Sequence, residues 1–393
     1  MLRQCSTPLV RSALLGPQWQ QLAAAAANTA SSWPCSASSC LQDSTAAAAG
    51  TGRSYSAAGM PANAMDMIKE LRKTSGAPIA DVKSCLAAAG WDMGAAMEAL
   101  RLKGLAAAVK KASRHASEGL VAVAQLGHEL VSVVEINSET DFVGRSAPFQ
   151  QLAAAAAKAA LGLAPQAAAA AGQVHEIDFQ QLAAARLGDG SSIEEGCALL
   201  AGQVRENIAL RRGYLVSAGP HGVVSSYVHM PVALGAGRIA AVVALQAGAQ
   251  LEQAAQAQLH QLGSNLAMHS AGMASQFISR QAMPAAALAT ARTDFESATA
   301  AQMPGKPAEV LAKIVDGKVA KWCKDVCLLD QKYLLDDSLT VSQLLKQQAQ
   351  QLQLQGGLTV SALLRVQVGE GLQREDAGKL DFAAEVAAMA GSK

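Results

Sequence analysis

The chain has 393 residues, of which 51% are hydrophobic and 16% are charged, and this length predicts two or three packed units. Much of the apolar content is alanine, and no run of about 18 strongly apolar residues occurs, so a typical membrane-spanning helix is excluded. The formal net charge is +1 without a basic block, which disfavours a general nucleic-acid-binding protein because such proteins normally have a basic face.

Serine and alanine dominate the first 65 residues, where Asp43 is the only acidic residue against three arginines. This composition is typical of an organellar transit peptide. The segment Arg53-Ser54-Tyr55-Ser56 is similar to a mitochondrial processing site with cleavage after the aromatic residue. We therefore expect residues 1–55 to be a transit peptide and the mature protein to lie in the mitochondrial matrix. A plastid is the alternative destination, because both kinds of peptide share this composition, and a tail without targeting function is another alternative.

Residues 62–115 are expected to form three short helices followed by a linker. Apolar residues at helical spacing predict a first helix over 66–73 and a second over 79–89, and Asp92 is placed to cap a third. The linker over 106–114 is expected to be helical with a solvated basic face. Three short helices with a glycine-containing turn resemble a ubiquitin-associated domain, which binds protein surfaces; a simple packing module is the alternative.

A strand and a polar loop follow, and the loop ends in a large aromatic residue. The residues Val131 to Ile136 predict a strand that is at least half buried, whereas Asn137 to Asp141 have a turn-forming composition. Phe142 then either folds back to anchor the loop in the core or projects into a partner. The residue pattern alone favours the anchor, because aromatic side chains are mostly buried.

The core is expected to consist of two related α+β subdomains, because each half places a strand hairpin before a helix. The first subdomain spans 116–217 and the second spans 218–279 and 326–368. In the first half, strands are expected at 120–126 and 130–136, followed by a helix that begins near 148. In the second half, strands are expected at 223–229 and 239–245, followed by a helical tract over 251–268.

The remaining segments are expected to be mainly helical. Residues 280–325 predict a helical hairpin with a break at 303–307, where two prolines and a glycine interrupt the helix. A loop, an amphipathic helix and a strand that rejoins the second sheet are expected at 330–337, 341–352 and 363–368. Residues 369–393 are expected to be a C-terminal module with a helix over 380–389.

No constellation of catalytic or metal-binding residues is visible in the sequence. None of the seven histidines lies in HExxH, and no serine lies in GxSxG or in a phosphate-binding GxxxxGKS loop. The seven cysteines are scattered; Cys323 and Cys327 lie one helical turn apart without a third ligand nearby. We therefore expect neither an enzyme nor a metal or cofactor site, and we expect that the protein itself holds no nucleotide.

Taken together, the motifs in this order and spacing resemble elongation factor Ts over nearly all of the chain after the transit peptide. In the N-terminal part these are Leu71-Arg72, Gly76-Ala77, Asp81-Val82-Lys83, Leu100-Arg101-x-Lys103-Gly104-Leu105, Glu118-Gly119-Leu120-Val121 and Glu135-x-Asn137-x-Glu139-Thr140-Asp141-Phe142-Val143. Further along they are Glu206-Asn207-Ile208-x-x-Arg211-Arg212, Tyr227-x-His229, Leu266-Ala267-Met268-His269, Gly305-Lys306-Pro307, Leu328-x-x-Gln331, Gly369-Glu370-Gly371 and Asp381-Phe382-Ala383-Ala384-Glu385-Val386-Ala387.

The resemblance implies a guanine-nucleotide exchange factor that binds elongation factor Tu, both with GDP and free of nucleotide. In this family the aspartate and phenylalanine of the Thr-Asp-Phe-Val motif intrude near the partner's magnesium site, so Asp141 and Phe142 are expected to act as a wedge. This implication reverses the preference for an anchor. Further partner contacts carried over from matching motifs are Thr140, Val143, Lys83, Val204, His229, Leu334 and Leu335.

The resemblance also implies an α+β fold with a ubiquitin-associated-like helical unit, a two-subdomain core, a coiled-coil insertion that is a candidate for self-association, and a C-terminal module. From composition and the missing motifs we also expect no cofactor, no direct nucleic-acid contact and no membrane contact. The alternative function is a non-catalytic scaffold or chaperone of elongation factor Tu or of the organellar ribosome. Three departures from the family pattern affect expected contacts: Arg205 replaces a usual glycine, Gly144 replaces a usual alanine or serine, and Pro78 and Ala80 replace residues of a Gly-Met-Met turn.

Overall fold

The structure is a computed structural model that describes residues 60–164, 172–303 and 305–372. It contains both helices and antiparallel strands, so the expected α+β class is confirmed. The expected transit peptide at 1–55 and the expected terminal helix at 380–389 lie outside the described residues. Within the described part, no helix combines the length and the apolar character that crossing a membrane requires.

Three helices form the N-terminal unit: α2 (Ala64–Ser75), α3 (Ile79–Ala88) and α4 (Met93–Lys111). Gly76 ends α2 in the left-handed conformation, which glycine adopts at low cost, and the Asp92 carboxylate accepts the amide hydrogen of Ala95 at the start of α4. Leu71, Val82 and Leu86 are fully buried between the helices. Most of the segment expected as a helical linker, residues 106–111, is the last part of α4, and residues 112–117 lead from this helix to β1 of the core.

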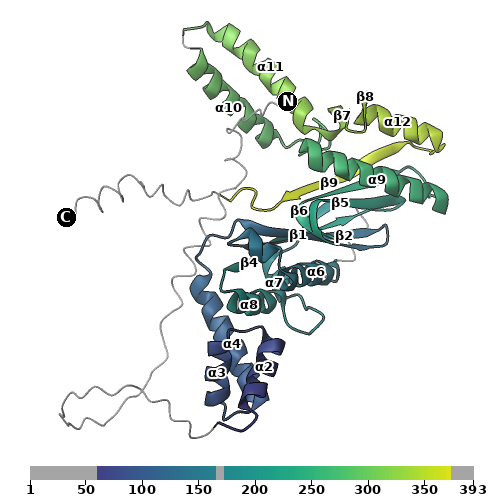
Figure 1. Cartoon of the computed structure of the whole chain (residues 1–393). Helices are drawn as coiled ribbons and strands as arrows, with labels where there is room; N and C mark the ends of the chain where they lie inside the picture. Colours follow the sequence, from purple (N-terminus) through teal and green to yellow (C-terminus); the bar gives the residue numbers. More distant parts are fainter. Residues whose placement is uncertain (1–59, 165–171, 304, 373–393) are drawn as a thin grey trace, which may run out of the picture.

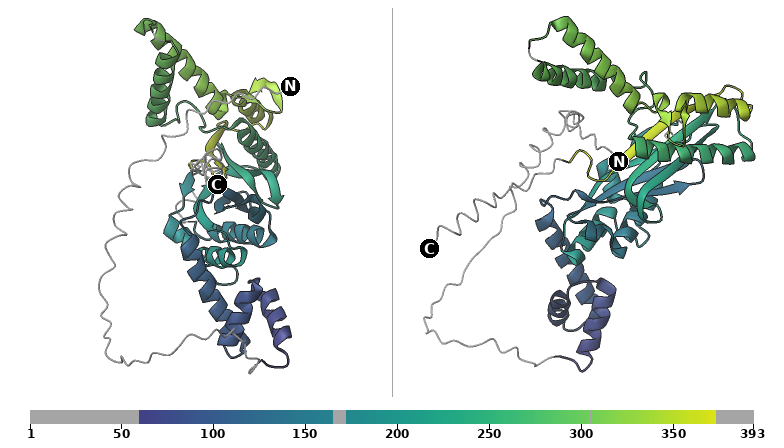
Figure 2. Two further views of the ribbon diagram at one scale, coloured as in Figure 1. Left: turned by 60° about the vertical axis from the view of Figure 1, so that its left-hand side comes forward. Right: turned by 45° about the horizontal axis from the view of Figure 1, so that its top comes forward.

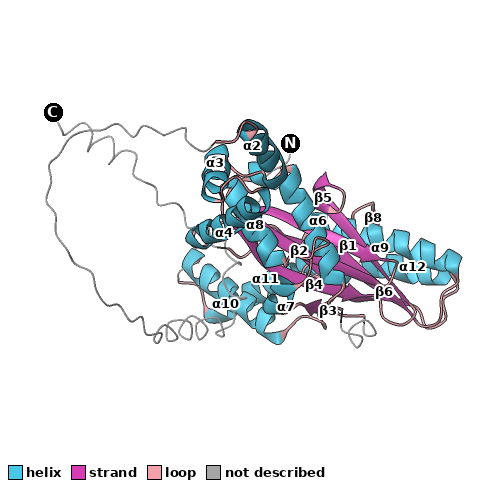
Figure 3. Cartoon of the chain, turned by 90° about the horizontal axis from the view of Figure 1, so that it is seen from below, coloured by secondary structure: helices cyan, strands magenta, loops and turns pink. Residues whose placement is uncertain are grey.

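In the described part of the chain, one antiparallel sheet of seven strands bends where β1 pairs with β6, so that its two halves, here called the first and the second sheet, lie face to face and carry helices on their outer faces (Figure 1; strands and helices are coloured separately in Figure 3). The first sheet contains β3 (Val174–Glu176), β4 (Ile208–Ser217), β2 (Leu130–Ser138) and β1 (Glu118–Leu126), and α6 (Ala147–Leu161), α7 (Phe179–Ala184) and α8 (Ile193–Val204) cover it. The second contains β5 (Gly222–Ala233), β6 (Ala236–Ala247) and β9 (Leu358–Gln367), and α9 (Gln253–Met273) and α12 (Val341–Gln351) cover it.

Strand β2 lies in the middle of this stack and is buried along its whole length. Successive side chains of a strand point to opposite faces, and here Val134 and Ile136 pack with the helices of the first half whereas Val131 and Val133 pack against the second sheet. The two sheets are joined at a corner where β1 pairs briefly with the start of β6, at Ala122 opposite Ala236 and the adjacent pair. The inter-sheet layer is therefore made by valines and alanines of both halves.

A buried carboxylate ties this layer to the end of β9. Glu135 has a fully buried side chain, and its oxygens accept hydrogen bonds from Arg211 Nη1 at 2.7 Å, Arg212 Nε at 2.7 Å and the backbone nitrogen of Gly369 at 2.8 Å. Arg211 also donates to the carbonyl oxygen of Glu370. These contacts cross from the first sheet to the chain that leaves the second sheet, so Glu135 holds the two halves together.

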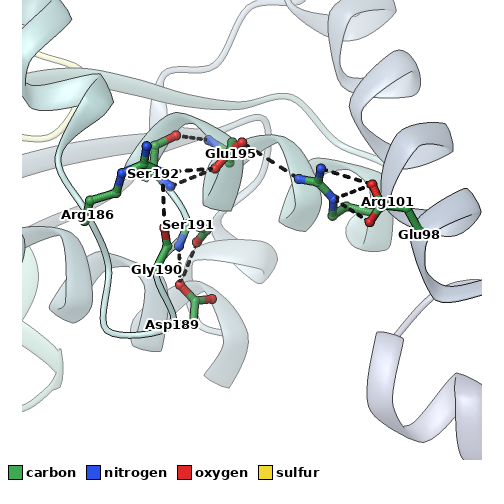
Figure 4. Close-up of polar contacts among 8 residues, drawn as sticks. All are labelled: Glu98, Arg101, Arg186, Asp189, Gly190, Ser191, Ser192 and Glu195. Carbon is green, nitrogen blue, oxygen red and sulfur yellow. Dashed lines mark hydrogen bonds and ion pairs between the residues drawn. The ribbon is translucent and has the colours of Figure 1, made fainter. Parts of the chain in front are cut away.

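The N-terminal unit docks onto α8 through two glycines. A Cβ atom on Gly202 would lie 2.8 Å from the Cα atom of Gly104 in α4, which shows how closely the two helices approach. Lys111 donates to the carbonyl oxygen of Ala201 at 3.0 Å, and Arg101 pairs with Glu195 at 3.8 Å. Figure 4 shows the second contact, together with the Ser192 and Glu195 capping box that begins α8. Both ends of α8 therefore hold the N-terminal unit on the core.

Arg205 ends α8 with a φ of 62°, in the left-handed conformation that favours glycine, as the family pattern has at this position. This conformation costs a residue with a Cβ atom about 1–2 kcal/mol. We expect Arg205→Gly to raise the free energy of unfolding by about 1 kcal/mol, measured by urea titration. Arg205→Ala is the matched control, because it also removes the guanidinium but retains the Cβ atom; an equal gain in both variants would contradict the backbone explanation.

Helices α10 (Ala285–Gln302) and α11 (Ala308–Val326) form a hairpin that projects from the second half (Figure 2). The break between them coincides with the expected one. Lys318 Nζ donates to Thr299 Oγ1 at 2.8 Å, and Arg292 pairs with Asp316 across the two helices. Val315, Val319 and Cys323 are buried at its inner side. The hairpin thus has its own apolar seam.

Several boundaries differ from the expectations. Strand β2 continues to Ser138, because Asn137 and Ser138 pair with both β1 and β4 despite their turn-forming character. The loop expected at 330–337 contains a small hairpin of β7 (Lys332–Tyr333) and β8 (Asp336–Thr340). The expected strand at 363–368 is confirmed as part of β9, which joins the second sheet beside β6. Strand β5 extends beyond His229 to Ala233.

Candidate functional site

The segment after β2 is a single helical turn, α5 (Asp141–Gly144), rather than an irregular loop. Phe142 at its start is 79% exposed, so the anchoring role favoured by the residue pattern alone is wrong. The Asp141 carboxylate pairs with Arg145 at 3.1 Å, four residues later. Val143 packs partly against the first apolar core. The turn therefore buries one apolar side chain and presents the larger one to solvent.

Two glutamates fix the base of this turn to the segment after α8. Glu206 accepts hydrogen bonds from the backbone nitrogen of Thr140 at 3.0 Å and from Thr140 Oγ1 at 2.7 Å. In the opposite direction, Glu139 accepts from the backbone nitrogen of Asn207 at 2.6 Å and pairs with Arg114 at 3.5 Å. These reciprocal contacts join segments more than sixty residues apart, so the position of Phe142 is set by two elements of the core.

Two glycines bring the turn close to β1. Gly119 has a φ of 130°, and a Cβ atom there would overlap the carbonyl oxygen of Ile136 and lie 2.7 Å from the Cα atom of Asn137. Gly144 rests on Gly119, but a Cβ atom on Gly144 would make ordinary contacts at 3.7 Å. Gly119 is thus required for the close approach of the strands, whereas the alanine usual in the family would fit at Gly144.

The other expected contact residues lie on separate elements. Lys83 is exposed on α3, and Val204 is the last residue of α8, partly buried next to the segment that holds Thr140. His229 is partly buried in β5 with its ring 6.2 Å from that of Tyr227. Leu334 and Leu335 are exposed in the turn between β7 and β8. In Figure 1, α3 and the β7–β8 hairpin lie at opposite ends of the molecule, so any surface containing all these residues is long.

A buried histidine, which was not among the expected contact residues, positions Leu334. His269 on α9 is fully buried; its Nδ1 atom accepts the backbone N–H of Leu334 at 3.1 Å. Nε2 therefore carries the proton, which it donates to Gln331 Oε1 at 2.9 Å. Ser275 Oγ donates to the same oxygen at 2.6 Å. The signal in the sequence was the motif Leu266-Ala267-Met268-His269, whose histidine falls on the buried face of α9.

This network predicts that stability decreases in acid. Burial lowers the pKa of His269 below its ordinary value of about 6.5, although the Gln331 hydrogen bond opposes this shift. Below pH 6.5 the unfolded chain then binds a proton that the folded chain does not, so stability falls as pH decreases, by at most about 1.4 kcal/mol per pH unit for one proton. Burial, with the nearby His128, also lowers the pKa of His260, which acts in the same direction.

The measurement is urea unfolding of the wild type and of His269→Gln between pH 7.5 and about pH 5. We expect a shallower pH dependence in the variant, because glutamine does not titrate. His175→Gln serves as the control, since His175 is exposed on β3 and lies outside this network. If His269→Gln retains the full slope, the assignment to His269 is wrong.

The described residues contain no group of three or more histidine, cysteine, aspartate or glutamate side chains that could hold a metal ion. Cys85, Cys197, Cys323 and Cys327 are buried and free. Burial raises the pKa of the Cys197 thiol to about 12 and that of Cys327 to about 11, which removes both from nucleophilic chemistry near neutral pH. The described surface includes a braced, exposed aromatic residue, and aromatic side chains are enriched at the centres of protein–protein interfaces.

Comparison with known proteins gives consistent results. The family model described as elongation factor TS matches residues 139–370, beginning at the glutamate that holds Asn207. The chain is 35% identical over 316 residues to the mitochondrial elongation factor Ts of Zea mays, covering 80% of this chain and 82% of the relative. It is 38% identical over 357 residues to the mitochondrial elongation factor Ts of Chlamydomonas reinhardtii, with 85% and 88% covered. The elongation factor Ts of Agrobacterium fabrum is 36% identical over 324 residues, with 82% and 97% covered.

Proposed function

The chain belongs to the elongation factor Ts family, and from this premise we propose that it promotes the release of GDP from elongation factor Tu in an organelle. The observation that carries the proposal is the 79% exposed Phe142 on a turn that Glu206 and Glu139 brace. An aromatic residue held in this way costs little ordering entropy when it enters a partner. The proposed partner form is elongation factor Tu with GDP, and GTP rebinds after GDP has left.

In the proposed mechanism, the turn carrying Asp141 and Phe142 inserts near the phosphates and the magnesium ion that the partner holds. A GTPase fixes GDP through backbone donors around the phosphates and through that ion. Asp141 brings a carboxylate, and Phe142 brings an apolar ring that needs a pocket in the GTPase. When these side chains displace groups that hold the ion and the phosphates, GDP loses part of its binding free energy.

The wedge alone is insufficient in energetic terms. Burying one phenylalanine side chain supplies about 1.5–3 kcal/mol, whereas a ~10⁴-fold weakening of nucleotide binding requires about 5.5 kcal/mol. Lys83, Val204, His229, Leu334 and Leu335 are the proposed further contacts, and the C-terminal module is another. Coupling of this kind is reciprocal, so GDP weakens the binding of this protein by the same factor. Because the contact residues lie on elements far apart, several elements would each supply part of the binding free energy that displaces GDP.

The finer assignments belong to the same proposal. The helices α2 to α4 are proposed to be a ubiquitin-associated-like unit that contacts the partner, and α10 with α11 a coiled-coil insertion that is a candidate for self-association. Residues 1–55 are proposed to be a transit peptide to the mitochondrial matrix, with a plastid as the alternative. Two of the relatives reported above are named as mitochondrial, which supports an organelle.

The test is the release of labelled GDP from organellar elongation factor Tu in the presence of catalytic amounts of the mature protein. We expect release to accelerate, and an unchanged rate would refute exchange activity. A stable complex without faster release would instead support the scaffold or chaperone function. Imaging a fluorescent protein fused to the first sixty residues would distinguish the mitochondrion from the plastid.

A further inference from the structure

A second apolar element lies beside the exposed aromatic turn, at the end of the β5–β6 hairpin. We call residues 230–234 of this hairpin the hairpin tip. Met230 is 62% exposed, Val232 is 36% exposed and Leu234 is fully exposed, at 101%. Single exposed apolar residues are common on protein surfaces, but these three, at the end of β5 and in the turn after it, lie within five residues and form a patch. The proposed exchange mechanism does not use these residues.

Backbone contacts with β1 and within the hairpin hold the hairpin tip in place. Met230 has a φ of 51°, a conformation that costs a side-chain-bearing residue free energy. Beyond the tip, the carbonyl oxygen of Gly235 accepts the backbone N–H of Val123 in β1 at 2.7 Å. Gly237 is packed so closely that a Cβ atom there would lie 2.6 Å from Val228 Cγ1. The tip is therefore fixed at the corner where the two sheets meet.

The hairpin tip and the aromatic turn line the same hollow, which has a volume of about 720 Å³. Met230, Pro231 and Val232 contribute one part of its lining, and Phe142 and Arg145 are among the residues that contribute another. Gly119 and the ion pair between Glu118 and Arg238 also line it. A partner that binds Phe142 and also fills this hollow would therefore contact Met230, Pro231 and Val232.

We propose that the hairpin tip is a second docking element for the GTPase that takes Phe142, and that the hollow receives a protrusion of that protein whose apolar side meets Met230 and Val232. This inference rests on the proposed function. The same GTPase is the proposed occupant because the hairpin tip and the turn that carries Phe142 line one hollow. A lipid surface fits less well, since the lining combines the acidic Glu118, Glu139 and Asp141 with the basic Arg145 and Arg238 and thus has no basic excess.

The test compares binding of the mature protein with that of the double variant Met230→Ser and Val232→Ser to nucleotide-free elongation factor Tu. Loss of two apolar contacts should weaken the affinity by about tenfold or more, mainly through faster dissociation. GDP release at limiting concentrations of the factor should slow accordingly. Val310→Ser on α11 is the control, because Val310 is similarly exposed but lies on the projecting hairpin.

A second variant separates the contact from any structural role. Met230→Gly removes the side chain while glycine adopts the positive φ without strain, so its thermal midpoint should equal or exceed that of the wild type although binding weakens. If the wild type accelerates GDP release and both tip variants bind as tightly as it does, the inference is wrong and the proposed function stands. If the tip variants alter only the oligomeric state of the free protein, the tip contacts a second copy and the inference is likewise wrong. A wild type that neither binds elongation factor Tu nor releases GDP would refute both.

Discussion

Replacing Phe142 with alanine should reduce the acceleration of GDP release by one to two orders of magnitude. The ring is 79% exposed in the free protein, so its burial in a pocket of elongation factor Tu would contribute about 1.5–3 kcal/mol, which corresponds to about 10- to 150-fold. Because the free protein buries little of this side chain, its folding should be unaffected. The measurement is the rate of labelled GDP release at several concentrations of the factor, together with the thermal midpoint.

The matched control is Phe179→Ala, because Phe179 is also an exposed phenylalanine, at 52%, at the start of a short helix, α7. We expect its exchange rate to remain that of the wild type. Equal rates for the wild type and Phe142→Ala would remove Phe142 from the mechanism and leave the exchange to other contacts. A loss of rate accompanied by a lower thermal midpoint would indicate instead that the turn had been disrupted.

Replacing Glu135 with glutamine should destabilise the fold by about 3–5 kcal/mol, the largest stability effect expected from a single polar substitution here. The carboxylate is fully buried and accepts hydrogen bonds from two guanidinium groups and from Gly369. Glutamine keeps the size but removes the charge and replaces an acceptor with a donor, so Arg211 and Arg212 lose their common counter-ion. Urea unfolding monitored by circular dichroism measures the loss.

Asp66→Asn provides the comparison, since Asp66 forms an exposed ion pair with Lys69 at 3.5 Å and such pairs contribute only about 0–1 kcal/mol. If Glu135→Gln costs no more than Asp66→Asn, the buried cluster does not hold the two sheets together. A loss of cooperativity in Glu135→Gln, with two separate transitions, would locate the damage at the contact between the sheets.

The secondary structure of the strand hairpins could be predicted from the sequence because their signals are local. The run from Val131 to Ile136 indicated a buried strand, and the Pro-Gly-Lys-Pro break placed the turn between α10 and α11. The capping box of Ser192 and Glu195 was also present in the sequence, although α8 was not anticipated. Only the fold explains why Asn137 and Ser138 remain in β2, since both neighbouring strands satisfy their backbone groups.

The candidate site could be predicted only in part. The motif gave Thr140 to Val143, but the partners that brace it, Glu206 and Asn207, are more than sixty residues away and no local pattern pairs them with this turn. Phenylalanine side chains are usually buried, but Phe142 is exposed because contacts distant in the sequence fix the orientation of its turn. The hairpin tip was missed because the strand was expected to end at His229, whereas β5 continues through Met230-Pro231-Val232 despite the proline.

The full burial of β2 bears on how the protein would act repeatedly under the proposed function. Nucleotide binding to elongation factor Tu weakens the complex by the reciprocal coupling described above, which frees the protein for another round. Phe142 lies on α5, which follows β2, and this strand is buried along its whole length, so the amide hydrogens of β2 exchange with solvent only when much of the core opens. Under the proposed function, the protein therefore presents Phe142 to elongation factor Tu without refolding this strand in each round of binding.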